Sequence, residues 1–138
     1  MYAHLTEARA AHAPADPVST IMSTPVAEIS ARASLAQVAE TLAAAEVGAL
    51  VVVDGTTVLG VLSERDLVRA LADGGDQDVL TAADLVSPET VWATPADTIS
   101  AVADLMAEAE VRHIPLRAGG HPVGMVSIRD VLQVLRTH

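Results

Sequence analysis

Two short stretches of this sequence place the same polar side chains in the same order: SERD at residues 63–66 and SIRD at residues 127–130. Each carries a hydroxyl, a guanidinium and a carboxylate within one helical turn. A Ser followed three residues later by Asp is typical of a capping box at a helix N-terminus. The same turn presents backbone N–H groups and partial positive charge to an anion, which is how phosphate sites form. The stretches are therefore candidate helix caps and candidate anion sites.

The capping pattern alone has little specificity. Ser34-x-x-Gln37 and Thr81-x-x-Asp84 fit similar templates elsewhere in the chain. A cap and a binding site can also share one turn, so both interpretations stay open for SERD and SIRD.

Cations accompany the two turns. Arg65 and Arg129 fall in the first helical turn, where the helix dipole disfavours a positive charge. Compensation of phosphate charge explains the repeated choice, and solvated positions or salt bridges between subunits explain it equally well. Arg112-His113 stand where the first half of the chain has Gly48-Ala49. This difference favours a polyphosphate at the second turn, whereas His113 can also be an ordinary half-buried histidine.

Other chemistries find no support in the residues. There is no Cys, no P-loop, and Gly124-Met-Val-Ser127 has the wrong spacing for a serine-hydrolase elbow. The five His do not form a ligand pattern, so no metal site is expected. Trp92 fits core packing or stacking on a base. We expect no enzyme activity and no required cofactor.

Composition narrows the class of protein. The 138 residues are 51% hydrophobic and 19% charged, which suits one packed globular body. The net charge of −10 argues against nucleic-acid binding. No apolar run reaches the length of a membrane span, and the N-terminus lacks the pattern of a signal peptide. These features predict a cytoplasmic protein that binds neither nucleic acid nor membrane.

An internal repeat organises the chain. A shift of 64 residues gives seven identities in 25 aligned positions, starting at Val47 on Val111 and ending at Leu71 on Leu135. The same shift preserves an i, i+3, i+7 apolar pattern in an earlier helix. Pro25 matches Pro88 at a shift of 63, so the second copy has gained one residue near Pro88. We predict a tail at 1–16, repeats at 17–73 and 81–138, and a linker at 74–80.

Each repeat reads as β-α-β-β-α. The predicted elements of the first are 26–29, 34–46, 49–54, 58–63 and 64–72, and those of the second are 90–93, 98–110, 113–117, 122–127 and 128–136, with a short helix at 81–86. The expected fold class is α/β, with the two repeats packed as one pseudo-twofold body, because neither repeat has enough core alone. Residues 1–16 have no counterpart in the second copy of the repeat. We predict that they form a mobile tail or a loosely docked helix.

The order of the predicted elements and the residues within them together resemble the CBS domain, which occurs in tandem pairs called Bateman modules. The resemblance rests on GVLSERDL and GMVSIRDV, preceded by VGALVVVD and VRHIPL, and covers about residues 17 to 138. It implies a regulatory module that binds AMP, ADP, ATP or S-adenosylmethionine in clefts between repeats, the Asp accepting from ribose hydroxyls and the Ser facing phosphate. The implied ligand-binding residues are Thr24, Val26, Gly48, Ala49, Leu50, Ser63, Arg65, Asp66, Thr90, Arg112, His113, Ile114, Pro115, Ser127, Arg129 and Asp130.

Two functions follow as hypotheses. The first is a sensor that binds an adenosine-type nucleotide and regulates another protein. The alternative is a ligand-independent module for dimerisation or protein interaction. Apolar faces on the predicted helices exceed what a small body can bury, so a homodimer is expected in either case.

Overall fold

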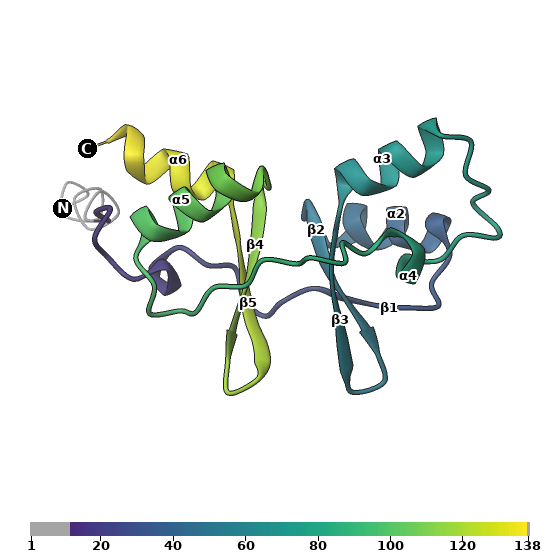
Figure 1. Ribbon diagram of the computed structural model, residues 1–138, viewed down its shortest axis with the longest axis horizontal. Helices are drawn as coiled ribbons and strands as arrows, with labels where there is room; N and C mark the ends of the chain where they lie inside the picture. Colours follow the sequence, from purple (N-terminus) through teal and green to yellow (C-terminus); the bar gives the residue numbers. More distant parts are fainter. Residues whose placement is uncertain (1–11, 138) are drawn as a thin grey trace. The chain divides into compact units, whose positions relative to one another are not determined.

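The computed structural model describes residues 12–137, which form two compact units (Figure 1). Unit 2 is Thr24–Thr90, and unit 1 combines the residues before it, up to Ser23, with those from Val91 onward. Both units mix strands and helices, which confirms the predicted α/β class. No helix in residues 12–137 has the length and apolar content needed to cross a bilayer.

Unit 2 follows the predicted order closely. Its elements are β1 (Glu28–Ser30), α2 (Leu35–Ala45), β2 (Ala49–Asp54), β3 (Thr57–Ser63), α3 (Glu64–Ala72) and the short α4 (Ala82–Leu85). β2 and β3 form an antiparallel hairpin, and β1 adds to β2 in parallel, giving the sheet order β1-β2-β3. The hairpin turns at Gly55, whose φ of +63° is a conformation that glycine adopts without strain.

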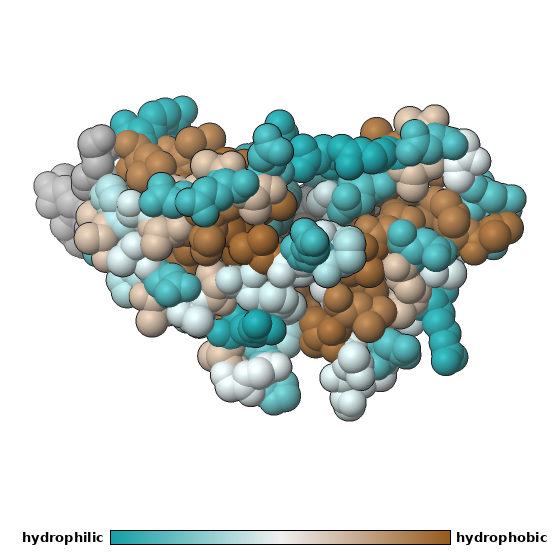
Figure 2. All heavy atoms as spheres, viewed as in Figure 1, coloured by the Kyte–Doolittle hydropathy of each residue, from teal (hydrophilic) through white to brown (hydrophobic). Residues whose placement is uncertain are grey.

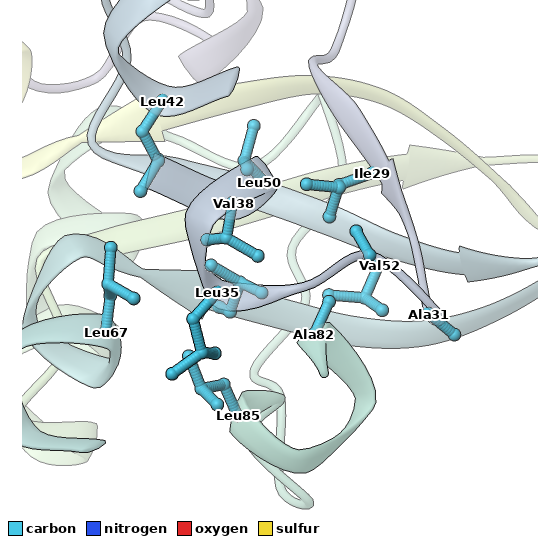
Figure 3. Packing of buried hydrophobic residues seen from close by; sticks show 12 residues of the cluster. Ile29, Ala31, Leu35, Val38, Leu42, Leu50, Val52, Leu67, Ala82 and Leu85 are labelled. Carbon is cyan, nitrogen blue, oxygen red and sulfur yellow. The ribbon is translucent and has the colours of Figure 1, made fainter. Parts of the chain in front are cut away.

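The core of unit 2 lies between α2 and one face of this sheet (Figure 3). Leu35, Val38 and Leu42 recur at helical spacing and are buried, and they pack toward Leu50 and Val52 of β2. Fully burying one such side chain contributes about 1.5–3 kcal/mol. The apolar stripe of α2 therefore fixes the helix on the sheet.

Unit 1 repeats the arrangement with α5 (Ile99–Ala109), β4 (His113–Ala118), β5 (His121–Ser127) and α6 (Ile128–Arg136), preceded by a 3₁₀ turn, η1 (Val18–Thr20). The buried stripe of α5 is Ile99, Val102 and Met106, at the spacing seen in α2. It packs in one cluster with Ile114 and Leu116 of β4.

The strand predicted at 90–93 does not form, and this prediction was wrong. Only Ala93 pairs in parallel, opposite Leu116 of β4. In unit 2 the N–H of Val51 donates to the carbonyl of Ala27 at 2.9 Å. The equivalent of Val51 in unit 1 is Pro115, which has no N–H to donate. The N–H of Ala31, which donates to the Val53 carbonyl in unit 2, also has a proline, Pro95, as its counterpart, so the parallel pairing shortens to a single residue.

The compact units cut across the sequence repeats. Val18, which opens the first repeat, is fully buried in the core of unit 1 with residues of the second repeat. Its counterpart Ala82 is fully buried in the core of unit 2. Their N–H groups make equivalent bonds, from Val18 to the Asp97 carbonyl at 2.7 Å and from Ala82 to the Ala33 carbonyl at 2.8 Å. Each repeat thus supplies a segment that completes the core built by the other.

The described part of the predicted tail, residues 12–16, is attached to the start of α5. Residues 1–11 lie outside the described part of the chain. Within 12–16 the carbonyls of Pro14 and Asp16 accept from the N–H groups of Ser100 and Ile99, at 2.9 and 3.0 Å. These donors belong to the first turn of α5, where amides have no partner inside the helix. Residues 14–16 are therefore part of unit 1.

Candidate functional site

The SERD turn of unit 2 is a complete capping box at the start of α3. The Ser63 hydroxyl accepts from the N–H of Asp66 at 3.3 Å. The Asp66 Oδ2 in turn accepts from the Ser63 N–H at 2.7 Å and from the Ser63 hydroxyl at 3.0 Å. The sequence predicts this geometry, because Ser and Asp stand three residues apart at the end of a strand.

The SIRD turn of unit 1 is a looser version of the same structure. The Ser127 hydroxyl accepts from the Asp130 N–H at 3.3 Å and donates to Asp130 Oδ2 at 2.9 Å. Between these two described residues, the bond from the Ser backbone N–H to the Asp is not made, so the box is incomplete. Asp130 therefore receives one bond from its serine, where Asp66 receives two.

Both turns are tied to the preceding strand in the same way. The N–H of Glu64 donates to the Gly48 carbonyl at 2.9 Å, and the N–H of Ile128 donates to the Arg112 carbonyl at 2.8 Å. These bonds bring the residues before β2 and β4 next to the helix N-termini. Each unit thus gathers a serine, a carboxylate and the start of a strand in one place.

This arrangement can bind a polar ligand while it caps the helix. In both turns the cap uses only Oδ2 of the carboxylate, so the cap leaves the other oxygen as an acceptor. Asp66 and Asp130 are both half-buried. A carboxylate held in this way can accept hydrogen bonds from a pair of hydroxyls, and charge-assisted bonds are the strong ones.

The predicted site residues divide between the units. Unit 2 holds Thr24, Val26, Gly48, Ala49, Leu50, Ser63, Arg65, Asp66 and Thr90, and unit 1 holds Arg112, His113, Ile114, Pro115, Ser127, Arg129 and Asp130. Four of these residues are buried: Leu50 and Ile114 lie fully buried in the two cores, and Ala49 and Pro115 beside them are buried as well. At these positions only the backbone could contact a ligand.

Thr90 has a structural role that the sequence does not indicate. Its hydroxyl accepts from the Val61 N–H at 3.0 Å and donates to the Ser87 carbonyl at 3.1 Å. In unit 1 the equivalent backbones bond directly, Ser23 with Met125 in both directions, at 2.8 and 3.1 Å. In unit 2 one of these two bonds forms, from the Ser87 N–H to the Val61 carbonyl at 3.1 Å, and the Thr90 hydroxyl takes the place of the other by bridging the Val61 N–H to the Ser87 carbonyl. Gly60 makes the room, because a Cβ there would collide with the Thr90 hydroxyl.

The cations are distributed unequally. Unit 1 carries Arg112 and Arg129, both exposed, and the half-buried His113. Unit 2 has only Arg65 among the predicted site cations. Two of the three arginines among the predicted site residues therefore belong to unit 1.

Sequence reasoning missed a partner of Trp92. The Arg117 guanidinium lies 4.8 Å from the centre of its ring, within the range of a cation–π contact. Trp92 is half-buried, so its ring is neither fully enclosed in the core nor fully open for a base to stack on it. The two residues are 25 apart in the sequence and no spacing rule links them. Residues 12–137 contain no group of three His, Asp, Glu or Cys arranged to hold a metal ion.

Comparison with known proteins identifies the family. The model of the CBS domain matches residues 18–73 and 82–137. An uncharacterized 17.7 kDa protein of Acidianus ambivalens is 30% identical over 121 residues, covering 86% of this chain and 72% of its own. An uncharacterized protein of Methanocaldococcus jannaschii is 29% identical over 121 residues, 87% of this chain but only 43% of the relative.

Solved structures agree with this assignment. A CBS-domain protein of Agrobacterium tumefaciens superposes with a TM-score of 0.75 at 30% identity, covering 80% of this chain and 84% of that one. The matched residues include both the SERD and the SIRD turns. The chain belongs to the CBS domain family and carries two CBS domains in tandem.

Proposed function

We propose that this CBS pair is a regulatory sensor that binds an adenosine-type nucleotide, AMP, ADP, ATP or S-adenosylmethionine, at its SERD and SIRD turns. CBS pairs are regulatory modules that often bind adenosine ligands. One observation carries the proposal: each Asp is oriented by its serine through Oδ2 and keeps its other oxygen outside the cap. That oxygen is an acceptor suited to ribose hydroxyls, beside helix N–H groups suited to phosphate.

Unit 1 is the better candidate for the occupied site. Asp130 is held by one serine bond and Asp66 by two, so Asp130 gives up less when it turns toward a ligand. Arg112 and Arg129 supply positive charge in the same unit, which also holds His113. A ligand with two or three phosphates would gain most from this set.

The proposed mechanism is linkage and contains no chemical step. A ligand that binds one arrangement of the chain better shifts the population toward that arrangement, by the difference in its two affinities. A regulated protein that contacts the module then senses the shift. We place the module in the cytoplasm, where adenine nucleotides are abundant and a chain without cysteine needs no oxidising environment.

Mass spectrometry of small molecules that co-purify with the chain is the first test, followed by calorimetric titration with ATP, AMP and S-adenosylmethionine. A ligand present at 100 times its dissociation constant should add about 2.7 kcal/mol to the free energy of unfolding. If none of the three binds or raises the melting temperature, the proposal is wrong.

A second candidate function is dimerisation without a ligand. Val68 of α3 and Leu132 of α6 occupy equivalent positions and are 63% and 52% exposed. Hydrophobic residues accordingly reach the visible surface over both helices (Figure 2). A second copy could cover equivalent patches across a twofold axis. A homodimer whose stability does not change when any of the three nucleotides is added would favour this function over the first.

A further inference from the structure

An open groove lies on unit 2 between β1 and α2. Its volume is about 590 Å³, and its walls include Glu28 and Ser30 of β1, Arg32 of the following turn, and Gln37, Glu40 and Thr41 of α2. β1 is an edge strand, with β2 on one side and no strand of the described residues on the other. The groove therefore follows a free sheet edge, and it lies apart from the SERD turn.

Backbone groups of β1 point into the space beside this edge. The Val51 N–H donates to the Ala27 carbonyl at 2.9 Å, and the Ala31 N–H donates to the Val53 carbonyl at 2.7 Å. Alternate residues of a strand direct their backbone groups to opposite sides, so residues 27, 29 and 31 bond β2. The N–H and C=O of Glu28 and the N–H of Ser30 then point outward. They form a row of donor, acceptor and donor.

β1 is short, with three residues, and carries the charged Glu28, but it lacks other features that protect a free edge. Edge strands are protected by proline, by a bulge or by a covering element. β1 contains no proline, and the irregularity in its sheet lies between β2 and β3. Unit 1 provides a contrast, because Pro115 reduces the equivalent pairing to Ala93 alone. An edge of this kind thus exists on one of the two units.

The charge of the groove selects the occupant. Glu28 and Glu40, both exposed, stand on its two walls, against the single guanidinium of Arg32. Successive side chains of an added strand point to opposite faces of the sheet. One set would lie beside Glu28 and the other would face Glu40, so basic side chains are favoured on both faces.

We propose that this groove binds an extended segment of a partner protein, rich in basic residues, which adds to β1 as a fourth strand. Main-chain hydrogen bonds to Glu28 and Ser30 supply affinity, and the two carboxylates supply selectivity. The proposal is independent of nucleotide binding. It gives the regulated protein a place to attach that differs from the ligand-binding turns.

The test is an NMR titration of the whole chain with the peptide acetyl-(Val-Lys)₃-amide. We expect the amide signals of Glu28 and Ser30 to shift and their hydrogen exchange to slow. A copy of the peptide N-methylated at every residue keeps the charge but has no N–H on the backbone of its residues to donate, and it should bind roughly tenfold more weakly or not at all. This control separates strand addition from general attraction to a chain with a net charge of −10.

Two variants complete the test. Glu40→Lys should weaken binding about 3- to 10-fold, whereas Asp104→Lys, the same charge change at the equivalent exposed position of α5, should not. Ser30→Pro removes an outward N–H without removing a bond to β2 and should abolish the protection of Glu28. If Ser30→Pro does not fold, the N-methylated peptide still decides. Absence of binding, equal binding of the methylated peptide, or equal loss in both Lys variants would overturn the proposal.

Discussion

Replacing Asp66 and Asp130 by Asn, one at a time, separates helix capping from ligand binding. Asn is nearly isosteric with Asp and keeps one acceptor oxygen, but it carries no charge. In each variant the serine hydroxyl still caps the amide of the replaced residue. The change therefore weakens the bonds that the carboxylate receives and removes its favourable interaction with the helix dipole.

The magnitudes differ between the two turns because the bonds differ. A hydrogen bond to a charged group contributes about 1.5–3 kcal/mol and a neutral one about 0.5–1.5, so each bond loses roughly 0.5–1 kcal/mol after allowance for partial exposure. The dipole term adds about 0.5 kcal/mol. Asp66 receives two serine bonds and Asp130 one. We expect Asp66→Asn to cost about 1.5–2.5 kcal/mol of folding free energy and Asp130→Asn about 1–1.5.

Ligand affinity should follow the opposite order. If Asp130 accepts two ribose hydroxyls, Asp130→Asn should reduce nucleotide affinity by roughly 10- to 150-fold, a larger loss than that of Asp66→Asn. Urea unfolding with an unchanged slope gives the stabilities, and calorimetric titration gives the affinities. A greater stability loss from Asp130→Asn would contradict the bond count. Equal nucleotide affinity of the wild type and both variants would show that the turns serve the fold alone.

Four further results are expected. Thr90→Val should destabilise the chain by about 1–3 kcal/mol in urea unfolding, because it leaves the N–H of Val61 without an acceptor, whereas Thr90→Ser should cost much less. Glu46→Gly should raise stability by about 0.5–1 kcal/mol, since Glu46 has a φ of +54° and places an acid at a helix C-terminus; a loss would refute the strain argument. Deleting residues 1–16 should lower the melting temperature more than deleting 1–11, because Pro14 and Asp16 bond α5. Light scattering should give roughly twice the 14.2 kDa chain mass, and a monomer would exclude the homodimer.

The helices and hairpins were predictable because their signals are local. β2 spans 49–54 as predicted, and Ser34 and Thr98 cap the helices that follow them, as expected. The SERD and SIRD caps were equally readable, since a capping box spans only four residues. The strand predicted at 90–93 failed because two donors of the ladder are missing, one at Pro95 nearby and one at Pro115, more than twenty residues away.

The candidate site was only partly predictable from the sequence, because some of its contacts leave no local signal. The sequence identifies the serines, carboxylates and cations of the two turns, because they recur at a shift of 64. It does not show that Asp66 receives a backbone bond that Asp130 lacks, or that the Thr90 hydroxyl is occupied by Val61 and Ser87. The Thr90 contacts depend on how β3 meets a segment that follows it by 29 residues.

By itself, the sequence determined the two repeats, the order of their elements and the chemistry of their turns, because helical period, strand alternation and capping act over a few residues. Only the tertiary structure decided which segment completes which core. Val18 and Ala82 are small apolar residues whose neighbours in the sequence do not indicate where they are buried, and each lies in the core built by the other repeat. Burial depends on contacts between distant parts of the chain, and such contacts leave no periodic signal.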